Sequence, residues 1–112
     1  MTKATQRPPR HLKPATRRWF ACVAKAYELE QHHLRLLVLA GESWDRCQAA
    51  REVIDRDGLT YLDRFACPRA RPEIAIERDS RIAFARIVRE LDLDVEAPPA
   101  SGRPPSLRQN RR

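Results

Sequence analysis

The chain has 112 residues, with 9 prolines, 3 glycines and a formal net charge of +7. At this length it forms one domain at most. Its three glycines provide no glycine-rich phosphate loop, no Walker-type lysine motif occurs, and no apolar run is long enough to span a membrane.

The two ends of the chain differ in composition from its middle. Residues 1–18 carry six basic side chains and no acid, and residues 97–112 carry four more and no acid. Subtracting these ten from 22 leaves 12 basic residues in the middle against all 15 acidic ones, a net charge of −3. Because both ends are also rich in proline and lack apolar periodicity, we expect a basic disordered arm at 1–13, a folded domain at 14–94 and a disordered Pro- and Arg-rich tail at 95–112.

The first predicted helix starts at Lys13-Pro14, with proline at its first position, and ends near Tyr27. Its apolar side chains recur at helical spacing: Trp19, Phe20, Val23, Ala24 and Tyr27. Two of these aromatic residues follow two arginines, a mixture that can stack nucleic-acid bases. Adjacent aromatics within a regular stripe are more often core residues, and we interpret them as such.

The second predicted helix runs from Gln31 to Asp57, and about 27 residues at 1.5 Å each make it roughly 40 Å long. It has two apolar rows. One contains Leu34, Leu37, Gly41 and Trp44, and the other contains Leu36, Ala40, Ser43, Cys47, Ala50 and Ile54. Two apolar faces need two partners, so we expect one partner within the chain and the other in a neighbouring subunit. The residues expected at this intersubunit interface are Leu36, Ala40, Ser43, Cys47 and Ile54. The alternative is that both faces are buried within the chain, against the first and last helices.

The second helix ends at Asp57-Gly58, where glycine tolerates the left-handed backbone that closes helices. The segment 59–72 is predicted to form a small β-hairpin, which is marginal in water and should pack on a helix or align with hairpins of adjacent subunits. A last helix from about Pro72 to Leu91 follows, with an apolar stripe of Ile76, Ala83, Phe84, Ile87 and Leu91. The predicted fold class is therefore mainly α: a helical hairpin with a long central helix, a small β-hairpin and a C-terminal helix.

No catalytic or metal-binding constellation stands out. The acidic residues around the predicted hairpin alternate with arginines, which indicates surface ion pairing rather than a two-metal nuclease site. His32 and His33 are adjacent and diverge by about 100° on a helix, so they do not form a two-ligand metal face. One of them is expected to cap or pack at the helix start and the other to be solvated. We expect no enzyme activity, no cofactor and no metal.

The three cysteines are far apart in the sequence and form no Cys-x-x-Cys pair. Together with the absence of a signal-peptide pattern, this favours a cytoplasmic protein with reduced thiols. Cys22 and Cys47 fall within helical patterns and are interpreted as small buried residues.

The stretch from Gly58 to Asp94 contains GLTYLDRF followed closely by RPEIAIERDSR, and HHLRLL and ESWDR precede it. In order and spacing these strings resemble the small subunit of tailed-phage terminases, in the short helical branch of that family. The resemblance covers about His32 to Asp94. One departure is Ala66-Cys67 at the predicted hairpin tip, where a glycine-bearing turn is expected.

The resemblance implies a ring-shaped homo-oligomer, larger than a tetramer, in the host cytoplasm. It would bind the viral packaging site on double-stranded DNA and recruit or regulate the large terminase subunit, which cuts and translocates. The residues predicted to contact DNA phosphates are Lys3, Arg7, Arg10, Lys13, Arg17 and Arg18. A helix-turn-helix transcription regulator is one alternative, and a scaffold whose tails bind acidic partners is another.

Overall fold

The structure is a computed structural model that describes residues 7–93. Helices α1 (Pro14–Ala26) and α2 (Gln31–Asp57) are followed by strands β1 (Thr60–Leu62) and β2 (Pro68–Ala70) and by helix α3 (Pro72–Leu91). The predicted mainly helical fold with one small hairpin is confirmed, and proline occupies the start of both α1 and α3 as expected. The predicted tails at 1–6 and 95–112 lie outside the described residues.

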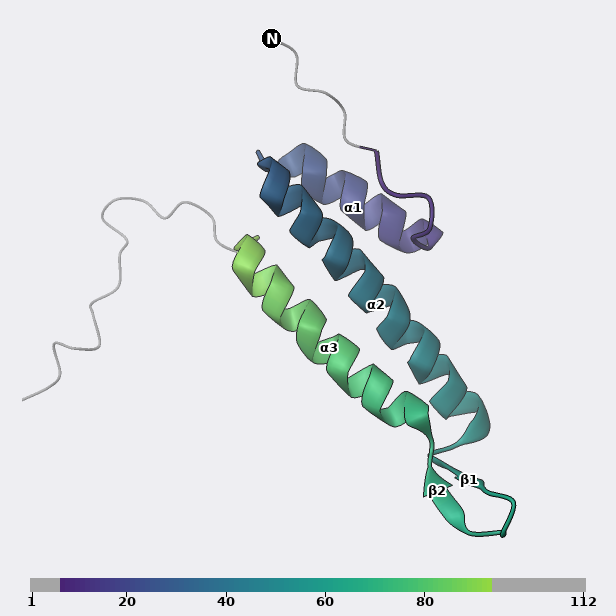
Figure 1. Cartoon of the computed structure of the whole chain (residues 1–112). Helices are drawn as coiled ribbons and strands as arrows, with labels where there is room; N and C mark the ends of the chain where they lie inside the picture. The colour runs from purple at the N-terminus through teal and green to yellow at the C-terminus, as the bar shows by residue number, and fades with distance from the viewer. Residues whose placement is uncertain (1–6, 94–112) are drawn as a thin grey trace, which may run out of the picture.

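Helices α2 and α3 run side by side in opposite directions over most of their length (Figure 1). Small side chains occupy the contact, which lets the two backbones approach closely. The buried small residues of α2 are Ala40, Ser43, Cys47 and Ala50, and Ser80 faces them from α3. One of the two apolar rows of α2 is therefore used inside the chain.

Helix α1 lies against the N-terminal half of α2 only, and the main core is where α1 meets the start of α2 and the end of α3 (Figure 1). The buried members of this core are Leu12, Phe20, Val23, Leu37 and Leu91. Gly41 permits the close approach, because a Cβ built there would lie 3.0 Å from Leu12 Cδ1 and 3.1 Å from Thr16 Cγ2. The hydroxyl of Tyr27 donates to the backbone carbonyl of Leu93 and joins the end of α1 to the end of the described chain.

The β-hairpin extends beyond the far end of the α2–α3 pair (Figure 1). Its strands are antiparallel, with Tyr61 opposite Arg69. The side chain of Arg71 ties its base to the helix, with Nε donating to the carbonyl of Gly58 and Nη2 to the carbonyls of Asp57 and Thr60. No residue of either strand is buried.

The hairpin turn is organised by one carboxylate. Asp63 accepts the backbone N–H of Phe65 at 2.8 Å and of Cys67 at 3.0 Å, and Arg69 Nε donates to its other oxygen at 2.9 Å. The turn needs one left-handed residue, and Ala66 supplies it with φ of 61°. Alanine therefore takes the conformation for which glycine was expected, at a steric cost that the bonds to Asp63 offset.

Four expectations from the sequence need correction. Cys22 is predicted to be a small buried residue but is exposed on α1. Leu12 is only 3% exposed and belongs to the core, so the folded body begins before residue 14. Ile76 was placed on the buried stripe of the last helix but is 39% exposed, and Glu77 and Ser80 are buried beside it instead. Tyr27 is predicted to lie on the buried stripe of the first helix but is 38% exposed.

Candidate nucleic-acid interface

The outward side of α1 is basic because its largest apolar side chains turn toward the body. Thr16, Phe20 and Val23 are buried against the body, which leaves Arg17 and Arg18 exposed to solvent. Helix α1 contains no acidic residue that would offset their charge.

The basic surface continues into the segment that precedes α1. Residues 7–26 hold six basic side chains and no acid: Arg7, Arg10, Lys13, Arg17, Arg18 and Lys25. All six are exposed, and none forms an ion pair with any residue that the structure describes. Five of the six predicted phosphate contacts are therefore exposed within the described residues. The sixth, Lys3, lies outside the described residues.

A shallow groove crosses this surface. It is lined by Pro8, Pro14, Arg17, Arg18 and Ala21, so two prolines and a helical turn flank two adjacent cations. Proline fixes its own φ and limits the residue before it, which stiffens the approach to α1. A stiff basic edge of this kind suits a polyanion backbone, whose phosphates attract positive charge irrespective of base sequence.

Two carboxylates of α2 hold this surface on the body. Asp45 accepts the backbone N–H of Lys13 at 2.8 Å and the hydroxyl of Thr16 at 2.5 Å. It thereby caps α1 from another helix, because Lys13 at the N-cap position has no capping side chain of its own. One turn earlier on α2, Glu42 Oε2 lies 2.7 Å from His11 Nε2.

Asp45, His11 and Glu42 could not be recognised from the sequence as residues that position the basic surface. No periodicity or motif marks them, since each pair joins residues about 30 positions apart. Only Leu12 carried a signal, as an isolated large apolar residue just before a helix-starting proline.

Five of the six acidic residues around the hairpin form local ion pairs with arginines, as the sequence predicted, and Glu73 is the exception among the described residues. Examples on the surface are Arg56 with Asp57 and Arg78 with Asp79. The pKa of Asp63 is lowered by the backbone N–H of Cys67 and by the side chain of Arg69. Within residues 7–93, no group of three or more His, Cys, Asp or Glu side chains is placed to hold a metal ion.

The two histidines at the start of α2 have the division of roles that was predicted. His33 Nδ1 accepts the backbone N–H of Glu30 at 3.4 Å, within a reciprocal capping arrangement. The side chain of His32 is 66% exposed. His33 thus serves the helix start and His32 is solvated.

The residues predicted for the intersubunit interface are divided by the structure. Ala40, Ser43 and Cys47 are buried within the single chain, against α3. Leu36 and Ile54 are half-buried. For the three buried residues the alternative of internal packing applies, so they are not available to a neighbouring subunit while α3 is in place.

Comparisons of the chain with family models, with curated proteins and with solved structures found no match. Among the described residues, no helix is long and apolar enough to cross a membrane.

Proposed function

We propose that this chain is a tailed-phage terminase small subunit that binds double-stranded DNA through the basic surface of residues 7–26 and delivers it to the large subunit. The observation that supports this most is that residues 7–26 contain no acid, are held on the body by Asp45 and expose six cations, none of which forms an ion pair within residues 7–93. The resemblance of GLTYLDRF and RPEIAIERDSR to that family supplies the packaging role.

Assembly into a ring larger than a tetramer is part of the proposal. A ring repeats each weak phosphate contact, so its subunits act at high effective concentration along one DNA. The chain also exposes large apolar side chains that neighbouring subunits would cover in a ring. Those exposed on the hairpin are Leu59, Tyr61, Leu62 and Phe65, and those exposed on the helices are Tyr27, Leu39, Trp44, Ile76 and Ile82.

A helix-turn-helix regulator fits these observations less well. Such proteins place a short second helix in the DNA major groove. Here α2 has 27 residues and is covered by α1 at its beginning and by α3 along its length (Figure 1). For α2 to act as a recognition helix, one of its faces would have to be free of both α1 and α3.

The DNA-binding part of the proposal is tested with two double variants of equal charge. Arg17→Ala with Arg18→Ala removes two cations from the proposed surface, and Arg86→Ala with Arg89→Ala removes two exposed cations from α3. We expect the first pair to weaken binding to double-stranded DNA and to flatten the log–log salt dependence by up to about 1.8 per engaged subunit. The second pair should change both quantities little. Equal effects of the two pairs would contradict a localised site.

The packaging role is tested with the large subunit of the same phage. Adding the wild-type chain should alter the DNA-dependent ATPase or nuclease activity of that subunit, and the Arg17/Arg18 variant should do so less. A chain that binds DNA as a dimer and leaves the activities of the large subunit unchanged would favour the helix-turn-helix regulator instead. A chain that does not bind DNA at any salt concentration would favour the scaffold.

A further inference from the structure

The tip of the β-hairpin has an ordered turn, but nothing within residues 7–93 covers it. Phe65 is 72% exposed and Leu62 is 67% exposed. The three bonds to Asp63 hold the turn that carries Phe65, so this side chain is presented by an ordered backbone. Arg64 lies beside it, with its guanidinium carbon 5.2 Å from the centroid of the Phe65 ring. The tip therefore combines one exposed aromatic ring with one cation.

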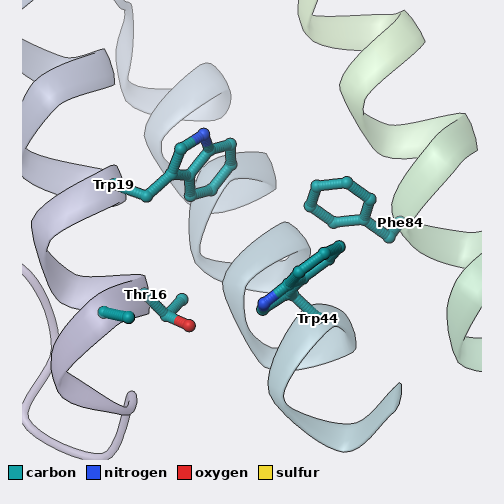
Figure 2. Close-up of a pocket in the computed structure, with 5 residues that line it drawn as sticks. Thr16, Trp19, Trp44 and Phe84 are labelled. Atoms are coloured by element: carbon teal, nitrogen blue, oxygen red, sulfur yellow. The ribbon is translucent and has the colours of Figure 1, made fainter. Parts of the chain in front are cut away.

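A pocket on the helical body has the opposite character. One ring from each helix contributes to it: Trp19 from α1, Trp44 from α2 and Phe84 from α3 (Figure 2). The Phe84 ring centroid lies 5.9 Å from that of Trp19 and 5.1 Å from that of Trp44, both at tilted angles. The cavity has a volume of about 210 Å³ and is open to solvent, and Trp44 is 43% exposed.

The charge beside this pocket is complementary to that of the hairpin tip. Thr16 lines the pocket and donates its hydroxyl to Asp45, which places a carboxylate next to the aromatic walls. A cation carried beside an aromatic ring, as Arg64 is beside Phe65, would meet this carboxylate when the ring enters the pocket. Aromatic rings favour the tilted contacts that such a three-walled pocket offers.

We propose that Phe65 of one copy of this chain inserts into the Trp19–Trp44–Phe84 pocket of a second copy. The occupant belongs to another copy because the hairpin begins after the end of α2. That end is 13 residues, or about 20 Å, beyond Trp44. Figure 1 shows the hairpin at the opposite end of α2 from α1, so it points away from its own pocket.

This contact joins two different surfaces of the same chain and is therefore heterologous. Repetition of a heterologous contact closes a ring or continues as a filament. The inference rests on the assembly part of the proposed function, since it specifies which side chains make the contact. It also assigns a partner to a hairpin that is marginal without one.

Intrinsic fluorescence reports on the pocket directly, because both tryptophans of the chain line it. On assembly of the wild-type chain we expect tryptophan emission to shift to shorter wavelength as protein concentration rises, in step with the mass measured by light scattering. Phe65→Ala should abolish the shift and reduce the mass to that of one subunit. Val53→Ala, a control that shortens a half-buried apolar side chain of α2 outside the pocket, should retain both.

Disulfide trapping provides a second test that does not depend on loss of assembly. Cys67 is exposed two residues from Phe65, and Ala15 is exposed at the edge of the pocket. With Cys22→Ser as background, Ala15→Cys should give a ladder of covalent oligomers on mild oxidation. Ala49→Cys, at an exposed position of α2 outside the pocket, should give no ladder. Adding Phe65→Ala to the Ala15→Cys variant should remove its ladder.

The outcomes separate this inference from the proposed function. A wild-type chain that stays monomeric at all concentrations would overturn the assembly part of both. An assembled wild type whose mass Phe65→Ala leaves unchanged, with no ladder from Ala15→Cys, would overturn only the inference. Covalent dimers through Cys67 alone would replace it with hairpin–hairpin pairing. Greater tryptophan exposure on deleting residues 94–112 from the monomer would instead assign the pocket to the chain's own tail.

Discussion

The carboxylate of Asp45, in the middle of α2, accepts the hydroxyl of Thr16 at 2.5 Å and so fixes the first turn of α1. The same carboxylate accepts the backbone N–H of Lys13. One side chain thus fixes where α1 begins and in which direction its outer side faces. Because Arg17 and Arg18 lie on that outer side, Asp45 also positions the proposed phosphate contacts.

Replacing Asp45 by alanine should lower the free energy of unfolding by about 1–2 kcal/mol, because a helix cap is lost and a backbone N–H loses its partner. Urea unfolding at fixed protein concentration measures this. Asp55→Ala is the matched control, since Asp55 forms only an exposed pair with Arg51 at 3.6 Å and should cost about 0.5 kcal/mol or less. Equal effects of the two variants would mean that Asp45 does not cap α1.

Gly41→Val should loosen α1 from α2. A Cβ at this position already lies 3.0 Å from Leu12, so a branched side chain overpacks the contact and should cost about 1–3 kcal/mol. Ala49→Val, at an exposed position of the same helix, should cost no more than about 0.7 kcal/mol through helix propensity. The urea concentrations at the unfolding midpoints of the two variants measure this difference in stability. A Gly41→Val chain as stable as the Ala49→Val chain would show that α1 can shift without cost.

Glu77 should make stability depend on acid pH. Its side chain is almost fully buried against α2, and the hydrogen bond from Arg81 holds its pKa below the ordinary value of 4.5, with burial acting in the opposite direction. A lowered folded-state pKa means that the stabilisation is present above the unfolded pKa and is lost as pH falls through the folded one. Glu77→Gln should therefore unfold more easily at pH 7 and show a flatter loss of stability below pH 4.5.

The control for this pH experiment is Asp79→Asn, because Asp79 pairs with Arg78 on the exposed side of the same helix. Urea midpoints measured from neutral to acid pH should be nearly the same for this variant and the wild type. If Glu77→Gln also follows the wild-type curve, the Glu77–Arg81 pair contributes nothing to acid sensitivity.

Truncation of the N-terminal arm should weaken DNA binding without unfolding the body. The cut has to end at residue 10, because Leu12 belongs to the core and His11 contacts Glu42. Deleting residues 1–10 removes three cations and should flatten the log–log salt slope by up to about 2.7 per engaged subunit. DNA affinity across a salt series measures the change, with oligomer mass as the control. An unchanged slope would place the phosphate contacts elsewhere.

The isolated chain should neither hydrolyse ATP nor cut DNA. Its sequence lacks a phosphate-binding loop, and Asp63 is engaged by two backbone amides and Arg69 in the hairpin turn. Assays with ATP and with supercoiled DNA plus divalent metal ions test this. Metal-dependent nicking that persists through purification and is lost in Asp79→Asn would contradict the expectation.

The sequence was sufficient to predict every helix and the hairpin to within about a residue. Apolar residues at helical spacing, prolines at helix starts and Gly58 after the long helix are local signals, and local backbone preferences decide where elements begin and end. The distribution of charge was also predictable, because the absence of acidic residues near the N-terminus follows from the composition alone.

Which faces the helices bury was decided only by the tertiary structure. The small residues of α2 are compatible with a neighbouring subunit or with α3, and the side on which α3 returns selects between them. Asp45 and Thr16 are 29 positions apart, so nothing local in the sequence indicates that one caps the helix of the other. Likewise, three rings from three helices form one pocket only because the helices pack at that level. Periodicity determines elements along the chain, whereas contacts between distant residues follow from how those elements pack.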